Sequence, residues 1–138
     1  MSNNHTFTEK LRSLGLRPTK QRLEICKLLF NRTNTFHFTI NDLKDFLNKT
    51  SQKKISLATI YNTIHAFKNK GYLKEISINS DKTYFDTNIT NHHHFFDESK
   101  KQLIDLDNKY VGKIKINKTL PGKKIKSVEV LVKVVNNN

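Results

Sequence analysis

Cysteine is nearly absent from this sequence of 138 residues, in which Cys26 is the only one. A single cysteine excludes an internal disulfide bond and a metal cage built from several thiolates. No apolar run approaches the roughly 18 residues that a membrane-spanning helix needs. The first ten residues are polar and contain no signal-peptide core. We therefore expect a cytoplasmic protein without a membrane partner.

Acidic residues are also few, with 12 Asp+Glu against 25 Lys+Arg and a formal net charge of +13. Such an excess favours a polyanionic partner, because each cation placed at a phosphate releases condensed counterions. A general abundance of lysine is the alternative explanation. Hydrophobic residues make up 36% of the chain, which is thin for two independent cores. Since small domains with little buried surface often oligomerise, we expect a dimer.

The sequence also lacks the usual signatures of an enzyme. It contains no nucleophile paired with a base, no glycine-rich phosphate loop and no His-Glu-x-x-His helix. We therefore expect a protein that is not an enzyme. The alternative is a metalloenzyme whose histidines hold a hydrolytic ion, and ester hydrolysis that depends on His92 or His94 would support it.

The N-terminal part of the chain predicts short helices followed by a β-hairpin. Thr39 and Ser56 are typical helix N-caps, and Gly71 suits the end of a helix. The expected helices cover about residues 8–14, 18–31, 40–47 and 57–70. Two strands, 73–78 and 83–86, flank a turn at 79–81. This order predicts a winged helix-turn-helix domain over residues 1–87.

Residues 88–138 predict mostly strands, so the expected fold class is α+β. The strands cover residues 93–96, 102–106 and 127–135, and residues 109–118 fit either a strand or a helix. In the last strand, alternate residues are valine, which is typical of a half-buried strand. These valines are Val128, Val130, Val132 and Val134.

The fourth expected helix has the pattern of a DNA-reading helix. At about 100° per residue, one arc is apolar and should pack on the core. This arc holds Leu57, Ile60, Ile64 and Phe67. The opposite face has no acidic residue and no long side chain near its start, so it can approach bases in a major groove. That face holds Ala58, Asn62, His65 and Asn69, with Thr59 and Tyr61 beside it. An ordinary amphipathic surface helix is the alternative, which the neighbouring helices and hairpin disfavour.

Three motifs resemble the ferric-uptake-regulator (Fur) superfamily. They are Gly15–Arg22, Leu57–Ile64, and Thr83–Asn88 followed by His92–Phe96. The Tyr-Asn-Thr centre of the second motif and the histidine run of the third are similar to the iron-response-regulator (Irr) branch. The resemblance extends from about Leu11 to Val135. It implies a winged-helix domain, a small C-terminal α/β dimerisation domain and a homodimer on double-stranded palindromic operator DNA.

The resemblance also implies DNA-contacting residues. Arg17 resembles the basic residue that enters the minor groove before the second helix, and Tyr61 matches a tyrosine that contacts phosphate and bases. From charge and position we add Lys20, Arg22 and Lys82 as phosphate contacts. A solvated surface charge is the alternative for each of these three. The full expected set is Arg17, Lys20, Arg22, Ser56, Ala58, Thr59, Tyr61, Asn62 and Lys82.

The run of three histidines predicts a metal site. On a strand, His92 and His94 face one side and His93 faces the other, so His92 and His94 can ligate one ion if other residues complete its sphere. The resemblance implies a regulatory metal site at the domain junction, with Asp105 as a fifth ligand. The expected ligands are His37, Asp86, His92, His94 and Asp105.

Departures from the family pattern point to the Irr branch. Many Fur-type proteins carry CxxC where this chain has Asp97 and Lys100, so we expect no structural four-cysteine zinc. The Irr branch responds to haem, which makes His92, His93 and His94 candidate haem ligands, because imidazole is a common axial ligand. We expect Cys26 to be a buried core residue.

These observations favour a repressor of iron and haem homeostasis genes that responds to haem or iron status. The cofactor is then haem, a divalent metal or both. The alternative is a Fur-type repressor activated by Mn²⁺, Fe²⁺ or Zn²⁺, and peroxide sensing is disfavoured because the usual structural cysteines are missing. An architectural protein that binds DNA by charge alone is a third interpretation, which predicts almost no sequence preference.

Overall fold

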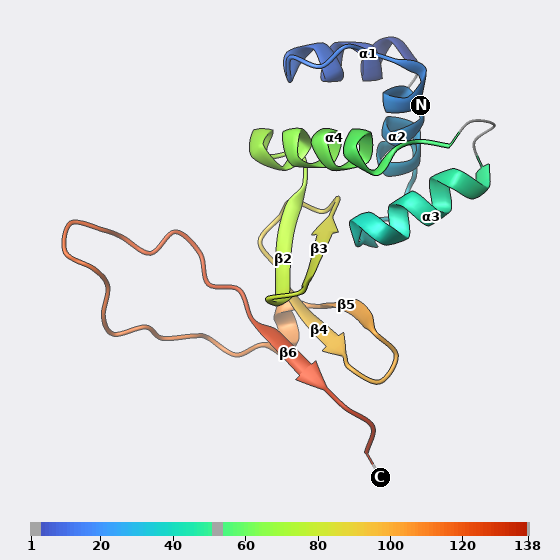
Figure 1. Ribbon diagram of the computed structural model, residues 1–138. Helices are drawn as coiled ribbons and strands as arrows, with labels where there is room; N and C mark the ends of the chain where they lie inside the picture. The colour runs from blue at the N-terminus through green and yellow to red at the C-terminus, as the bar shows by residue number, and fades with distance from the viewer. Residues whose placement is uncertain (1–3, 51–53, 138) are drawn as a thin grey trace. The chain divides into compact units, whose positions relative to one another are not determined.

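The computed structural model describes residues 4–50 and 54–137. The chain divides into two compact units, Met1–Ile89 and Thr90–Asn138, and each is described by itself. Figure 1 follows the chain from blue at its N-terminus to red at its C-terminus. Within the described ranges, no helix combines the length and the apolar character that crossing a bilayer requires.

The first unit begins with four helices. They are α1 (Asn4–Ser13), α2 (Lys20–Phe30), α3 (Ile40–Thr50) and α4 (Leu57–Lys70). The cap predicted at Ser56 is present, because its hydroxyl oxygen accepts a hydrogen bond from the Thr59 N–H at 3.1 Å. Gly71 ends α4 in the left-handed region, with φ at 89°. The α2 helix begins at Lys20 rather than at Pro18, because Thr19 is extended and is itself the N-cap.

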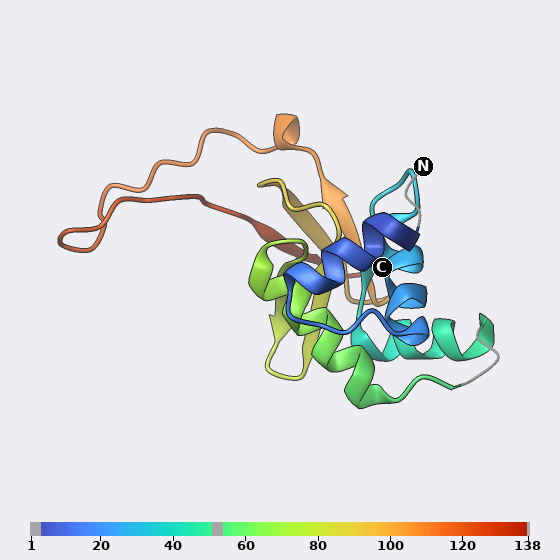
Figure 2. The same cartoon turned by 90° about the horizontal axis from the view of Figure 1, so that it is seen from above.

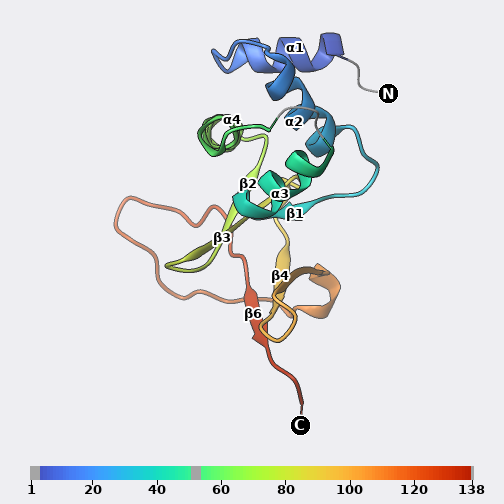
Figure 3. The same ribbon diagram turned by 45° about the vertical axis from the view of Figure 1, so that its right-hand side comes forward.

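A three-stranded antiparallel sheet completes the first unit, in the order β1-β3-β2 (Figure 3). Its strands are β1 (His37–Phe38), β2 (Lys74–Asn79) and β3 (Lys82–Asp86). The β2–β3 hairpin was predicted, and we call it the wing. The two-residue β1 was not predicted, because it is too short to show a periodic pattern. The order of elements confirms a helix-turn-helix domain followed by a hairpin.

The four helices and the wing share one apolar core. On α4, Ile60, Ile64 and Phe67 are fully buried, as predicted. The prediction for Leu57 was wrong, because 44% of this residue is exposed, whereas Thr63 is fully buried. Leu57 is the first residue of α4 and lines a groove beside that helix, so the core-facing stripe begins one turn later, at Ile60.

The second unit is a three-stranded sheet in the order β5-β4-β6. Its strands are β4 (His93–Asp97), β5 (Gln102–Leu106) and β6 (Leu131–Val134), and a 3₁₀ turn follows β5 at Asn108–Tyr110. The β4 strand pairs antiparallel with β5 and parallel with β6. The last strand is shorter than predicted, because β4 offers partners only from His94 to Asp97, and Val128 and Val135 are exposed.

Residues 111–130 form a long extended segment between β5 and β6, which we call the arm (Figure 2). It turns at Pro121 and Gly122, where Gly122 adopts a φ of 72°. Among the described residues, 112–119 and 124–128 make no hydrogen bond, ion pair or ring contact. The arm carries six lysines and one acidic residue. It therefore exposes both its backbone and a strong positive charge.

Cys26 lies in the core, as predicted, and is fully buried. Burial raises the pKa of its thiol to about 12, although the positive charge of Lys10 acts in the opposite direction. At pH 8 only on the order of 10⁻⁴ of such a thiol is ionised, and the thiolate is the reactive form.

We expect iodoacetamide to leave Cys26 unmodified in the folded protein and to alkylate it in urea, as measured by mass spectrometry. Fast alkylation without urea would place Cys26 outside the core.

Candidate metal ligands and nucleic-acid interface

The outward face of α4 is open to a partner. Ala58 and Asn62 are exposed, and Tyr61 is 52% exposed. The first turn of the helix has no acidic residue, so no negatively charged side chain of α4 offsets the positive end of its dipole. Ser56 is also exposed, and its hydroxyl is engaged in capping the helix. This face therefore presents small and polar groups, and one large aromatic ring, at the start of a well-capped helix.

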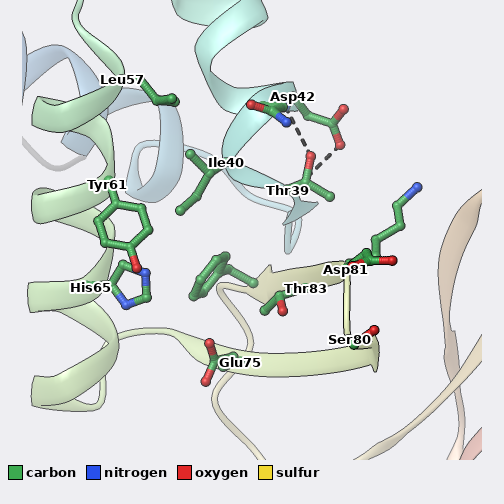
Figure 4. A pocket seen from close by; sticks show the side chains of 13 residues that line it. Thr39, Ile40, Asp42, Leu57, Tyr61, His65, Glu75, Ser80, Asp81 and Thr83 are labelled. Carbon is green, nitrogen blue, oxygen red and sulfur yellow. Dashed lines mark hydrogen bonds between the residues drawn. The ribbon is translucent and has the colours of Figure 1, made fainter.

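A groove of about 640 Å³ separates α4 from the wing (Figure 4). Tyr61 and His65 project from α4 on one side, while Thr83 and Phe85 of β3 line the other. The start of α3 also lines it, where Thr39 and Asp42 form a reciprocal capping box. The sequence placed Tyr61 and His65 near the outer face of α4 but gave no sign that they line a common groove with the wing.

The candidate phosphate-binding cations differ in their surroundings. Arg17 and Lys20 are exposed. Arg22 is partly buried, and its Nη1 donates to the Arg17 carbonyl oxygen at 3.0 Å, so it braces the turn before α2. On the wing, the Lys82 ammonium lies 5.6 Å from the centre of the Tyr84 ring. Burial raises the pKa of Tyr84, and the negative charge of Asp42 adds to the effect.

The first unit contains a histidine–carboxylate pair in which the carboxylate is buried and the histidine is partly exposed. His37 on β1 and Asp86 on β3 are direct cross-strand partners, and their Nε2 and Oδ2 atoms lie 3.0 Å apart. Asp86 is fully buried, and its Oδ1 accepts a hydrogen bond from the Asn88 N–H at 2.8 Å. A carboxylate enclosed in this way needs a positive charge nearby, because burial strongly disfavours an uncompensated anion.

The second unit contributes a cluster of three donors. The Nε2 atoms of His92 and His94 lie 3.2 and 3.3 Å from the same Oδ1 of Asp105. The β4–β5 register sets this arrangement, because His94 and Asp105 are cross-strand partners. The two imidazole rings are 4.3 Å apart between centroids. The ligand atoms of the three residues therefore converge within 4.8 Å, as in a metal site.

The hydrogen bond behind His92 defines the chemistry of this cluster. Its Nδ1 lies 2.7 Å from the carbonyl oxygen of Thr90, and a carbonyl only accepts hydrogen bonds. Nδ1 must therefore carry the proton, which leaves a lone pair on Nε2 in the neutral ring. That lone pair faces a carboxylate oxygen, so the arrangement needs either a protonated imidazole or a cation between them. Histidine ligands of metals are typically held by such a bond to the outer nitrogen.

His93 is bound differently. Its Nδ1 accepts a hydrogen bond from the backbone N–H of Val130 at 2.8 Å, next to β6. The proton of the neutral ring is then on Nε2, and a metal at Nε2 would require breaking the bond to Val130. His93 therefore ties the end of the arm to β4 rather than joining His92 and His94.

The two positions that matched a family CxxC motif form a hydrogen-bonded turn. Asp97 Oδ1 accepts from the N–H groups of Ser99 and Lys100 at 2.9 and 3.0 Å. This turn leads into the β4–β5 hairpin, in which Lys101 adopts a φ of 56°. In this chain the Asp97 carboxylate therefore orders, by hydrogen bonds, the segment in which the family pattern has two cysteines.

Known proteins of similar sequence are transcriptional repressors. The peroxide-responsive repressor PerR of Staphylococcus epidermidis is 33% identical over 107 residues, covering 75% of this chain and 69% of the relative. PerR of Staphylococcus aureus strain Mu50 is also 33% identical over 107 residues, and the alignment covers 75% of this chain and 70% of that relative. The chain that carries these histidines and carboxylates is therefore similar in sequence to known repressors.

Solved structures of similar fold carry names from the same group. The Vibrio cholerae ferric uptake regulator aligns with a TM-score of 0.69 at 18% identity, covering 94% of this chain and 98% of that one. The Pseudomonas aeruginosa ferric uptake regulator with manganese aligns at 0.67 and 16% identity, over 96% and 98% of the two chains. At these identities the likeness concerns the fold. A model of the ferric uptake regulator family matches residues 13–134, nearly the whole sequence, and the chain therefore belongs to the Ferric uptake regulator family.

Proposed function

We propose that this protein is a homodimeric repressor that reads palindromic operator DNA with α4 and responds to a divalent ion. The proposed ion ligands are His37, Asp86, His92, His94 and Asp105. The observation that carries the proposal is the convergence of His92 Nε2 and His94 Nε2 on the same Oδ1 of Asp105, at 3.2 and 3.3 Å. His92 Nδ1 is held by a backbone carbonyl, which directs Nε2 toward this point as in a metal-ligating histidine.

The donor set indicates which ions fit. Three imidazoles and two carboxylates offer nitrogen and oxygen donors without a thiolate, which suits Fe²⁺, Mn²⁺ or Zn²⁺. The ion would supply two positive charges, and these match the two carboxylates of Asp86 and Asp105. An ion held by ligands from both units would couple its binding to the arrangement of the units, and so to the spacing of the two α4 helices in a dimer.

A haem-responsive role, as in the Irr branch, is the second candidate. The run of histidines and the resemblance to Irr support it, and control of iron and haem homeostasis genes would follow. His93 is the weakest of the three haem candidates, since its Nδ1 is engaged by Val130. His92 and His94 are then the remaining candidates to bind haem iron.

The homodimer is supported by the surface of the second unit. Several large apolar side chains on the arm are exposed, with 38% to 69% of each residue accessible in the described structure. These are Ile114, Ile116, Leu120, Ile125 and Val128. Contiguous exposed apolar groups of this kind mark interaction surfaces. A second copy of the chain is the partner that we propose, in agreement with the dimer that the family resemblance implies.

Titration of the protein with an operator selected from random DNA duplexes tests which ligand, a divalent ion or haem, controls DNA binding. We expect the metal-free protein to bind it weakly, and Mn²⁺ to raise its affinity at least tenfold through the ligands above. The double variant His92→Gln, His94→Gln should lose this response, whereas His5→Gln, a change in an exposed histidine of α1, should keep it. If haemin instead weakens binding and its Soret shift depends on His92 and His94, the haem-responsive candidate holds. An affinity that ignores both additions contradicts the proposed signal.

The placement of the reading helix has its own test. Tyr61→Ala removes the large exposed ring from the face of α4, and we expect a loss of specific operator binding of at least about tenfold. The dimer should remain intact in sedimentation analysis, because Tyr61 lies outside the core. Unchanged operator affinity in fluorescence anisotropy would mean that another surface reads the DNA.

The final strand tests the dimer. Val132 is partly buried on β6 and pairs with Phe95, so Val132→Asp places an unpaired charge there and should dissociate or unfold the dimer. Lys133→Asp changes the exposed neighbour on the same strand and should leave the dimer intact. Sedimentation equilibrium and circular dichroism measure both variants. A stable Val132→Asp dimer would remove β6 from the interface.

A further inference from the structure

An aromatic stack connects the outward face of α4 to the wing. The rings of Tyr61 and His65 lie 4.1 Å apart between centroids, with 42° between their planes. The His65 ring in turn meets Phe85 of β3 at 5.8 Å, nearly at right angles. Figure 4 shows Tyr61 and His65 side by side on α4, both directed toward the groove. His65 thus lies between a half-exposed tyrosine and a buried phenylalanine.

The position of His65 follows from the helix and from the core. Residues four apart on a helix lie on the same face one turn from each other, which brings His65 under Tyr61. Phe85 is only 2% exposed and packs against Phe38 with centroids 5.8 Å apart. The backing of His65 is therefore part of the rigid core, whereas Tyr61 has solvent on its other side.

Tyr61 has little else to hold it. Among the described residues, its ring makes no ring contact besides that with His65, and its hydroxyl makes no hydrogen bond. The groove beside it has about 640 Å³ of space, which is ample for the ring to turn away. A side chain that is already held in its bound conformation loses less freedom on binding than one that must be ordered at that moment.

We propose that His65 is a positioning residue for DNA reading, which supports the Tyr61 ring, is itself backed by Phe85, and so links the tyrosine to the strand that carries Asp86. This inference rests on the proposed reading of DNA by α4. Its chemistry is stacking rather than hydrogen bonding, so that an aromatic ring of similar size can replace the imidazole. The partner is the same operator DNA, which Tyr61 contacts and His65 does not.

The aromatic stack lies next in sequence to the His37–Asp86 pair of the first unit. Phe85 directly precedes Asp86 on β3, and Phe38 directly follows His37 on β1. Phe85, which backs His65, and Phe38, which packs against Phe85, are therefore sequence neighbours of two proposed ion ligands. An ion that tightens the pairing of His37 with Asp86 also fixes the ring on which His65 rests. This route lies entirely inside the first unit and needs no movement of one unit against the other.

Three variants separate positioning from direct contact. His65→Ala should weaken operator binding about tenfold, because Tyr61 must then be ordered on binding. His65→Phe should keep the affinity within about twofold, since a phenyl ring can stack on Tyr61 and Phe85. Tyr61→Ala is the reference for complete loss of the ring. Melting temperatures are measured alongside the affinities, and His65→Ala should melt within a few degrees of the original protein.

Each contrary result has a distinct meaning. Full affinity in His65→Ala, with binding lost in Tyr61→Ala, overturns the positioning role and leaves the reading by α4 standing. Equal losses in His65→Phe and His65→Ala would mean that the imidazole nitrogens themselves contact DNA, which also overturns positioning. Full affinity in Tyr61→Ala contradicts the proposed reading by α4 and this inference with it.

A measurement without DNA tests the link to Asp86. The four tyrosines are replaced by 3-fluorotyrosine, and Tyr61→Phe assigns the fluorine signal of Tyr61. We expect diamagnetic Zn²⁺ to shift or sharpen this signal in the original protein and to leave it unchanged in His65→Ala, with ion binding to both followed by calorimetry. A signal that responds equally in both proteins, or in neither while Zn²⁺ binds, overturns the link.

Discussion

The burial of the Asp86 carboxylate is the constraint on which the first unit depends. A fully enclosed anion is tolerated only where positive charge or strong hydrogen bonds surround it. Its two oxygens are committed to His37 and to the Asn88 backbone, which fixes β1 against β3 and sets the exit of the chain from β3. The position of Phe85, and through it the floor of the groove beside α4, follows from the same constraint. The proposed ion at Asp86 would therefore act next to the strand that forms the floor of the groove beside α4.

The second unit is stabilised by a small apolar core together with polar contacts. Its three-stranded sheet buries few apolar residues, chiefly Phe96, Leu103 and Leu106. Three strands with one apolar face are close to the lower limit for independent stability. Polar contacts fill part of the deficit, since His93 joins β4 to the end of the arm and Asp97 closes the hairpin. The donor cluster of His92, His94 and Asp105 therefore lies in a small structural unit that gains stability from ordering its polar groups.

Local sequence signals predicted the helices well, because caps and apolar spacing act within a few residues. Ser56 and Gly71 bracket α4 as expected, and β5 spans the residues that its pattern indicated. Features that depend on distant partners were not predictable in the same way. The short β1 exists only because β3 pairs with it, and β6 stops where β4 stops offering partners. The exposure of Leu57 depends on where the core ends along α4, which helical spacing does not indicate.

The candidate site shows the same division. The alternation of His92, His93 and His94 on a strand follows from backbone geometry, and the spacing of two residues brought His92 and His94 together. The shared oxygen of Asp105 depends on the β4–β5 register, and the protonated Nδ1 of His92 depends on a carbonyl two residues away. The contact between His65 and Phe85 joins a helix to a strand, and no periodicity within either element indicates it.

The arm has a consequence for the lifetime of the protein. Proteases take their substrates in extended form with free backbone groups, and exposed extended segments are the preferred sites of nicking. Residues 111–130 offer this conformation together with six lysines, each a cleavage site for a trypsin-like enzyme. In the proposed dimer, a partner that covers the arm would shield these bonds, so a lone protomer would be degraded faster than an assembled one. Turnover would then remove the unassembled fraction of the protein.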